Sequence, residues 1–529
     1  MLNTLRSSRG MVVAPHHLAA QAGLAVLRDG GNAIEAAVAT AAAVAVVYPH
    51  MNSIGGDNFW LVAEPGSAPR AIMATGGAGS KATPEAYRAA GHTAVPARGP
   101  WAANTVAGAI SGWEAALEIA REWDGRLPLS RLLSDAIVFA CDGFPATKSQ
   151  SRYTALKRGD LEPVPGYAQQ FLPGGAAPEA GATFRQPRLG ETLKRLAQAG
   201  LADFYRGEIA AANAADLQRL GSPVTADDLA THRAIETTPL RAALRSGDVY
   251  NVPPPTQGIA SLIILGVFDR LGCPTADGYA HLHGLVESTK QAFLVRDRIV
   301  TDPAYATEEP HTYLAASELD KMASRIRADR ALPWPAPPGG GDTIWLGVID
   351  GAGRAVSLIQ SIYWEFGSGV VLPSTGVLWQ NRGMSFSLAD GALNPLRPGR
   401  KPFHTLNPAM ARLVDGRLMV YGTMGGEGQP QTQAAVFTRH VLYGQELQAA
   451  ITAPRWLLGR TWGQASTNLK IENRVDPSVV ASLRQAGHDV ELIEPFSDLM
   501  GHAGAIVRDP TGALSGAADP RGDGIPAAY

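Results

Sequence analysis

A short segment rich in proline and glycine, residues 331–342, separates two parts of this chain that differ in sequence pattern. Four prolines fall between Pro333 and Pro338, and Gly339–Gly341 follow directly. Proline lacks a backbone N–H and glycine loses much conformational freedom on folding, so neither suits the interior of a helix or strand. We therefore expect an exposed linker here, and a chain organised around it.

The part before this segment is dominated by apolar residues at helical spacing. Its clearest helix start is Asn32, which is expected to cap a helix at residues 33–48, with Glu35 in the N3 position of a capping box. Gly30 and Gly31 separate this helix from an earlier one. We expect further helices at residues 112–121, 129–141, 189–199, 209–220, 258–271 and 279–298, and strands at 59–63, 70–74 and 249–252.

The part after the segment carries three hairpin signatures, in which alternating strands flank a glycine-containing turn. The first joins residues 343–349 to residues 355–362 through Asp350–Gly353. The others are expected at residues 412–421 and 505–517. The sequence therefore predicts a helix-rich first part, residues 1–342, and a strand-rich second part, residues 343–529.

Charge balance and apolar stretches argue against two classes of protein. Lys and Arg number 46 against 48 Asp and Glu, so the net charge is −2, without the basic excess of nucleic-acid-binding proteins. The longest apolar stretch, Ala36–Tyr48, is too short to cross a bilayer. The first residues contain no apolar segment typical of a secretory signal. We expect a cytoplasmic protein without membrane or nucleic-acid partners.

Histidines at helical spacing are candidates for metal ligands. His281 and His283 lie in the helix expected at residues 279–298, and Glu287 follows His283 by one turn. No third group of ligands in the sequence supports a metal, and two cysteines cannot form a thiolate cluster. We interpret these histidines as packed or solvated helix residues, and we expect neither a metal nor another cofactor.

Two further motifs have a chemical and a structural interpretation. His16–His17 could be a ligand pair, but a helix start is the simpler interpretation. Gly55–Asn58 could bind an anion through backbone amides, yet the same residues are typical of a plain turn, which we favour.

Thr343 opens the strand-rich part directly after Asp342. If the peptide bond between these residues were cut, Thr343 would carry both a hydroxyl nucleophile and a free α-amine. Such an amine has a pKa near about 8, so it can act as a base at neutral pH. Cleavage would thus create a nucleophile and its base in one residue. The G-x-S-x-G motif of α/β-hydrolases and the Walker A motif are both missing from the sequence.

Motifs along nearly the whole chain resemble those of the γ-glutamyltranspeptidase family of N-terminal-nucleophile hydrolases. They are Gly30–Ala36, Pro49–Gly56, Pro253–Pro255, Gly341–Thr343, Phe366–Gly369, Gly425–Gly426, Ala453–Arg455 and Ala518–Arg521. The resemblance implies an α+β fold, a four-layer αββα sandwich formed jointly by two subunits of one precursor. It implies self-cleavage between Asp342 and Thr343, which gives a large subunit of residues 1–342 and a small subunit of residues 343–529. The heterodimer could itself form dimers.

The resemblance also assigns catalytic roles. Thr343 matches the nucleophile, and Ser361 matches a hydroxyl on the second strand that orients it. Gly425 and Gly426 match paired glycines whose N–H groups form the oxyanion hole, a task that suits glycine because no Cβ blocks the approaching carbonyl.

The glutamate-recognition residues of the family do not carry over. Thr75 stands in place of an Arg that grips the α-carboxylate, and His404–Thr405 replace two serines. Tyr363, Arg382 and Ser385 stand where an Asn, a Gln and an Asp bind the α-amine. The loss of an acid and the gain of Arg382 favour an anion near the scissile carbonyl, because a guanidinium binds carboxylates through two bonds. The expected substrate-binding residues are Arg382, Asn381, Tyr363, His404 and Thr405.

This departure resembles the amidohydrolase branch of the family, in residues 360–363, 379–387 and 401–408. The resemblance implies hydrolysis of a small acidic amide. The expected substrate is oxamate, a compound of purine catabolism, which would give oxalate and ammonia. Alternatives are a γ-glutamyl hydrolase or transpeptidase, in which Glu365 or Glu427 would replace the lost acid, and an acylase that removes glutaryl-type side chains. A decayed scaffold without activity is a further alternative, and Arg382 could instead form a structural ion pair.

Overall fold

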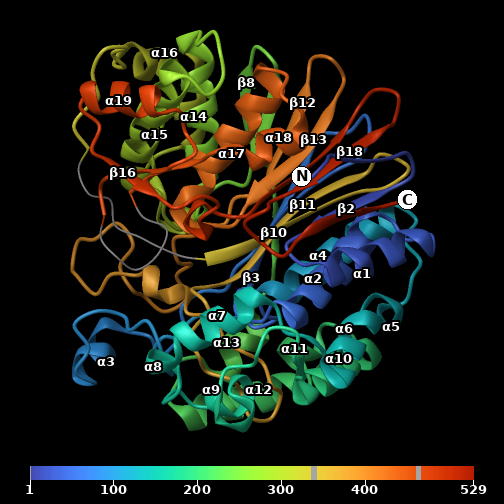
Figure 1. Cartoon of the computed structure of the whole chain (residues 1–529). Coiled ribbons are helices and arrows are strands. Elements are labelled where there is room, and N and C mark those ends of the chain that lie inside the picture. The colour runs from blue at the N-terminus through green and yellow to red at the C-terminus, as the bar shows by residue number, and fades with distance from the viewer. Residues whose placement is uncertain (1, 335–341, 460–465) are drawn as a thin grey trace.

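The computed structural model describes residues 2–334, 342–459 and 466–529, so most of the predicted linker lies outside the described residues (Figure 1). Among the described residues, no helix combines the length and apolar character needed to cross a membrane.

Two seven-stranded antiparallel sheets form the centre of the molecule. The order in the first is β1 (Leu5–Ser7), β18 (Leu514–Ala518), β17 (Ala503–Arg508), β13 (Leu418–Thr423), β12 (Ala409–Leu413), β9 (Gly247–Asn251) and β8 (Leu240–Leu244). The order in the second is β19 (Ile525–Ala528), β2 (Met11–Ala14), β10 (Asp342–Ile349), β11 (Ala355–Tyr363), β3 (Asp57–Ala63), β4 (Arg70–Ala74) and β7 (Ile235–Thr237).

The two sheets face each other across an apolar layer to which both contribute. Trp345 of β10 lies in this layer, where a Cβ added to Gly422 of β13 or Gly504 of β17 would come within 2.4 Å of its indole ring. Glycine at these positions therefore lets a bulky ring from one sheet fit against the backbone of the other.

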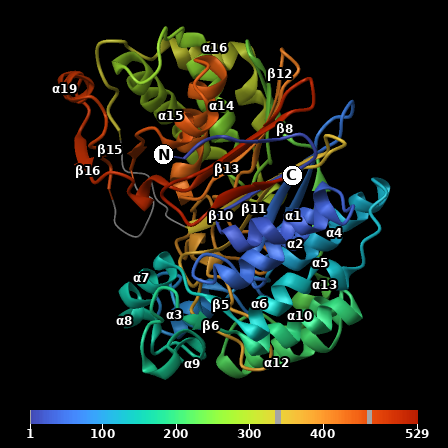
Figure 2. The same cartoon turned by 45° about the vertical axis from the view of Figure 1, so that its right-hand side comes forward.

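Helices cover the outer face of each sheet (Figures 1 and 2). The second sheet packs against α1 (His17–Arg28), α2 (Ala33–Val47) and α4 (Ala109–Glu122), and the first against α14 (Gly258–Leu271), α17 (Gln429–Phe437) and α18 (Leu447–Thr452). The helix α15 (Tyr279–Ile299) packs against α14 and α17. This arrangement confirms the predicted αββα sandwich.

The remaining elements surround this sandwich. The helices are α3 (Pro84–Ala89), α5 (Leu129–Leu132), α6 (Ser134–Asp142), α7 (Lys148–Leu156), α8 (Arg158–Leu161), α9 (Tyr167–Phe171), α10 (Pro187–Ala199), α11 (Asp203–Arg206), α12 (Glu208–Leu220), α13 (Ala226–Thr231), α16 (Ala316–Ser324) and α19 (Pro477–Gln485). Small sheets pair β5 (Phe144–Pro145) with β6 (Thr183–Phe184), and β14 (Trp456–Leu458) with β15 (Leu469–Glu472) and β16 (Val490–Ile493).

Local sequence signals mostly give the observed elements. The Asn32 side chain accepts bonds from the N–H groups of Ile34 and Glu35, and the Glu35 carboxylate accepts one from Asn32 N, so the capping box is confirmed. All three hairpins are also confirmed. The helix expected at residues 129–141 is instead divided into α5 and α6 at Leu133.

The helix-rich and the strand-rich part do not fold separately. The hairpin of β10 and β11 inserts between β2 and β3, and β12 and β13 lie between β9 and β17. Each sheet therefore combines strands from both sides of the predicted cleavage point, and neither part has a sandwich of its own.

Candidate active site

Thr343 is buried near the start of β10, in the second sheet. Its Oγ1 donates a hydrogen bond to Ser361 Oγ of β11, at 3.2 Å, and Ser361 Oγ accepts another from Tyr363 N at 2.8 Å. The ladder between β10 and β11 shifts register between Asp342 and Ile344, an irregularity of the kind that re-aims a side chain. In the continuous chain the Thr343 nitrogen belongs to the peptide bond with Asp342, so its free amine exists only after cleavage.

Gly425 and Gly426 lie in the loop that follows β13, a strand that contacts β10 and β11 across the sandwich. Their φ angles of +120° and +51° fall in the region that favours glycine. Among the described residues, neither amide N–H of this pair has a hydrogen-bond acceptor, while the Gly426 carbonyl accepts from Gln257 Nε2 at 2.8 Å. The loop therefore has two N–H groups available for a ligand oxygen.

Tyr363 connects the nucleophile to the predicted anion-binding residue. It stands opposite Asp342 in the β10–β11 ladder, and its ring lies 3.3 Å from the guanidinium carbon of Arg382. Its φ of +82° is strained for a residue with a side chain, a conformation that costs about 1–3 kcal/mol and clusters at functional sites. The ring of Tyr363 thus packs on Arg382, next to the strand that carries Thr343.

Arg382 is 1% exposed, yet no carboxylate forms an ion pair with it among the described residues. Nη1 donates to the carbonyl of Phe403 at 3.1 Å, and within the same residues Nη2 is buried without a hydrogen-bond partner. Burial lowers the pKa of Arg382 to about 10, against the opposing effects of Tyr363 and Asp57, so the group remains charged at neutral pH. A buried cation with an unused donor is a site for an anion. The alternative of a structural ion pair has no support in these contacts.

His404 lies beside this cation and bonds to Asp57, which begins β3 and does not lie in the plain turn predicted for Gly55–Asn58. His404 Nε2 is 2.9 Å from Asp57 Oδ2, so Nε2 carries a proton and Nδ1 presents a lone pair. Burial and the charge of Arg382 lower the pKa of His404 to about 4, which keeps the ring neutral. Asp57 also accepts from Thr75 Oγ1 at 3.0 Å and stands opposite Ser361 in the β3–β11 ladder. The sequence feature that could have indicated a functional Asp57 is an acid that directly follows two glycines at the start of a strand.

The side chains of Asn381 and Thr405, also predicted to bind substrate, differ in whether their hydrogen-bonding groups are already used within the protein. The amide of Asn381 is used within the protein, since it donates to the Ala97 carbonyl at 2.9 Å and accepts from Trp364 N at 3.1 Å. Its place is therefore to shape the loop that carries Arg382. The Thr405 hydroxyl is buried without a partner among the described residues.

A cavity of about 600 Å³ lies next to these residues. Tyr363, Ser385 and Phe403 form part of its wall, together with Trp364 and Arg296. Tyr363 and Phe403 are also the contacts of Arg382 described above, so the cavity borders residues that surround the guanidinium.

Two acids considered as replacements for the lost amine-binding group already have cations as partners. Glu365 lies 3.6 Å from Lys157 Nζ, and Glu427 lies 3.0 Å from Arg296 Nη2. Both carboxylates are buried, so each ion pair neutralises its acid before any substrate binds.

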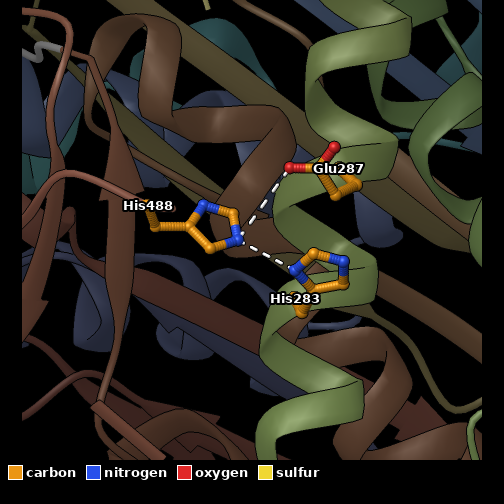
Figure 3. A group of neighbouring side chains, drawn as sticks. All are labelled: His283, Glu287 and His488. Atoms are coloured by element: carbon orange, nitrogen blue, oxygen red, sulfur yellow. Dashed lines mark hydrogen bonds and ion pairs between the residues drawn. The ribbon is translucent and has the colours of Figure 1, made fainter. Parts of the chain in front are cut away.

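The helix histidines are packed inside the protein, one of the two environments expected for them. His283 and Glu287 of α15 are buried, and His488, absent from the predicted group, lies against both (Figure 3). The sequence pattern could not indicate His488, because it lies 205 residues after His283. His16, as interpreted, caps α1 by accepting a bond from Leu18 N.

Comparison with known proteins places these features in a family. The gamma-glutamyltranspeptidase family model matches residues 19–529. The oxamate amidohydrolase proenzyme of Klebsiella pneumoniae is 55% identical over 99% of both chains, and the glutathione hydrolase-like YwrD proenzyme of Bacillus subtilis is 41% identical over 99% of both. Among solved structures, a cephalosporin acylase from Bacillus halodurans superposes with a TM-score of 0.92 at 33% identity, covering 100% of this chain and 97% of that one.

Proposed function

The chain belongs to the gamma-glutamyltranspeptidase family and is a hydrolase of linear amides, and we propose that its substrate is a small acidic amide of the oxamate type. The observation that carries this proposal is the buried Arg382, whose Nη2 has no partner among the described residues. In oxamate the carboxylate is bonded directly to the carboxamide, so an anion held by Arg382 brings the scissile carbonyl close to the strand that carries Thr343. The name of the Klebsiella relative supports the same substrate.

In the proposed maturation step, Thr343 Oγ1 attacks the carbonyl carbon of Asp342. The acyl group moves from nitrogen to oxygen, and water then hydrolyses the ester. The products are a carboxylate at Asp342 and a free α-amine at Thr343. Ser361 holds the attacking hydroxyl through the 3.2 Å hydrogen bond.

In the proposed reaction, the Thr343 hydroxyl attacks the amide carbon of the substrate while the α-amine takes its proton. The N–H groups of Gly425 and Gly426 stabilise the oxyanion of the tetrahedral intermediate. The same proton goes to the leaving nitrogen, which departs as ammonia, and an acyl ester remains on Thr343. Water activated by the amine then releases oxalate. The neutral ring of His404 adds no second positive charge beside Arg382, so one cation matches one carboxylate.

A γ-glutamyl substrate is less well served by this site. Its ammonium group would have to bind near Arg382, a buried cation, and the two candidate acids are already paired with Lys157 and Arg296. Like charges at short distance in a buried site disfavour such binding.

Ammonia release from oxamate and glutamine, together with aniline release from a γ-glutamyl anilide, tests the proposal with one preparation of the cleaved enzyme. We expect the highest kcat/KM with oxamate. A higher kcat/KM with either γ-glutamyl compound would reject the oxamate assignment while leaving the amide-hydrolase class intact. Hydrolysis of oxamate by a chain that denaturing gel electrophoresis shows to be uncut would instead reject the maturation step.

A further inference from the structure

His283, Glu287 and His488 form a buried group outside the residues that contact Thr343 and Arg382 (Figure 3). His283 and Glu287 lie one turn apart on α15, and His488 lies in the connection between α19 and β16. One ligand atom from each residue falls within 4.8 Å of the others. The group therefore joins residues from both sides of the predicted cleavage point.

The protonation of the two rings follows from their contacts. His283 Nε2 lies 2.7 Å from the Arg327 carbonyl, which can only accept, so Nε2 carries the proton and Nδ1 has a free lone pair. His488 Nε2 lies 2.8 Å from that Nδ1 and is therefore the donor. The lone pair of His283 Nδ1 therefore points toward His488, and a ring nitrogen with a lone pair is the group that binds metals.

We propose that this group is a binding site for a divalent transition-metal ion of the zinc type, with His283 Nδ1, His488 Nε2 and Glu287 Oε1 as ligands. Two imidazoles and a carboxylate are a donor set that zinc favours, with a fourth position left for water. The Arg327 carbonyl supplies the outer contact that fixes the ring of a ligating histidine. Binding requires the other tautomer of His488, in which the proton lies on Nδ1 and the lone pair of Nε2 faces the ion. The two ligating nitrogens then separate to about 3.3 Å around a tetrahedral ion.

Lys290 is the group that a metal has to displace. Its Nζ lies 2.7 Å from Glu287 Oε1 and also donates to the Leu332 carbonyl at 2.7 Å. In this structure the ammonium thus neutralises the carboxylate that would bind the ion. An ammonium and a metal ion compete for the same oxygen, so Lys290 sets the affinity of the site.

The site also fixes the segment that leads into the predicted cleavage region. Glu287 Oε2 accepts from Leu332 N at 3.0 Å, and Ala331 N donates to the Ala486 carbonyl at 2.7 Å, two residues before His488. An ion bound here would therefore link residues 331–332 of the first part, through Glu287, to His488 of the second.

Two titrations of the metal-depleted full-length protein test the site. Binding of Zn²⁺ is measured by calorimetry, and binding of Co²⁺ by its visible absorption. We expect one ion per chain, at least tenfold weaker binding in His283→Gln and His488→Gln, and tighter binding in Lys290→Met. His311→Gln, at an exposed histidine, is the matched control and should bind as wild type does.

Thermal unfolding provides the second measurement, since an ion that binds only the folded state raises Tm. Zn²⁺ should raise the Tm of the wild type and of Lys290→Met, but not that of His488→Gln. The proposal is overturned if neither the wild type nor Lys290→Met binds the ion. It is also overturned if the histidine variants bind Zn²⁺ as tightly as the wild type.

Discussion

The buried pair Arg521 and Arg455 differs from the buried Arg382 in how the positive charge is compensated. Arg521 is enclosed by Glu472 and Asp519, with N–O distances of 2.7 and 3.1 Å, and Arg455 Nη2 lies 2.5 Å from Asp519. Arg382 is equally buried, but only a carbonyl oxygen and the face of Tyr363 contact its guanidinium among the described residues.

This difference agrees with a structural role for Arg521 and Arg455 and with the substrate-binding role that we propose for Arg382. The carboxylates beside Arg521 and Arg455 compensate the cost of burying both cations, so the cluster is complete without a ligand. Both arginines belong to motifs that carry the family resemblance, and their partners explain why arginine stands there. Arg382 has no such compensation within the described residues, and in the proposed function the carboxylate of the substrate supplies it.

The proposed activity at Arg382 requires the nucleophile Thr343. Thr343→Ala removes the hydroxyl needed for both self-cleavage and attack on the substrate, so we expect a single uncut chain with no measurable amide hydrolysis. Denaturing gel electrophoresis and an ammonia assay check this, and Thr343→Ser should still be cut, at a lower rate. Normal fragments from the alanine variant would place the cleavage point elsewhere.

The structural side is tested most strongly by Arg521→Met. The change leaves Glu472 and Asp519 buried with reduced compensation, and loss of one partner of a buried pair typically costs about 3–5 kcal/mol. We expect urea denaturation to show a loss of unfolding free energy of this size. A loss below about 1 kcal/mol would mean that the cluster does not stabilise the fold as its distances imply.

Arg382→Gln should have the opposite profile, with a large effect on substrate binding and a small one on stability. A charge-assisted pair contributes about 1.5–3 kcal/mol, which corresponds to a KM for oxamate raised roughly 10- to 100-fold. Self-cleavage and the urea midpoint should stay close to the wild-type values, since no carboxylate is left unpaired. Steady-state kinetics together with denaturation checks both halves. An unchanged KM would make Arg382 structural after all.

His404, beside Arg382, and Asp519, beside Arg521 and Arg455, should make the stability of the protein depend on pH in different ranges. The folded-state pKa of His404 is about 4 against an ordinary 6.5, so the unfolded chain binds the extra proton and stability falls as pH drops from about 6.5 to about 4. Burial opposes ionisation of Asp519, but Arg455 and Arg521 outweigh it and lower its pKa to about 2 from 3.8. The contribution of Asp519 to the free energy of unfolding is present above pH 3.8 and is lost as pH falls toward 2.

Urea denaturation across this pH range resolves the two contributions. His404→Gln should flatten the slope of stability between pH 6.5 and 4, although other buried histidines keep part of it, and Asp519→Asn should flatten only the slope below about pH 4. Equal slopes in wild type and His404→Gln would show that His404 does not titrate as its burial implies.

Local chemistry determined how much of this structure the sequence could predict. Asn32, Glu35 and the three glycine-containing turns act within a few residues of one another, and the elements that they predict are present. Thr343 could be proposed as the nucleophile because its chemistry needs only its own hydroxyl and amine. The pairs Asp57–His404 and His283–His488 join residues 347 and 205 positions apart, which no local pattern records. They became visible only once the strands and helices had brought them together.

The interleaved strand order has a consequence for the lifetime of the cleaved protein. A cut between Asp342 and Thr343 would be a nick in one cooperative structure, because β10 and β11 remain hydrogen-bonded between β2 and β3. The two fragments could then part only by breaking both sheets, so their rate of separation would be the rate of global unfolding and would not depend on dilution. Fragments produced from separate genes would have to find each other as unfolded chains, and the order of synthesis, then folding, then cutting avoids that search.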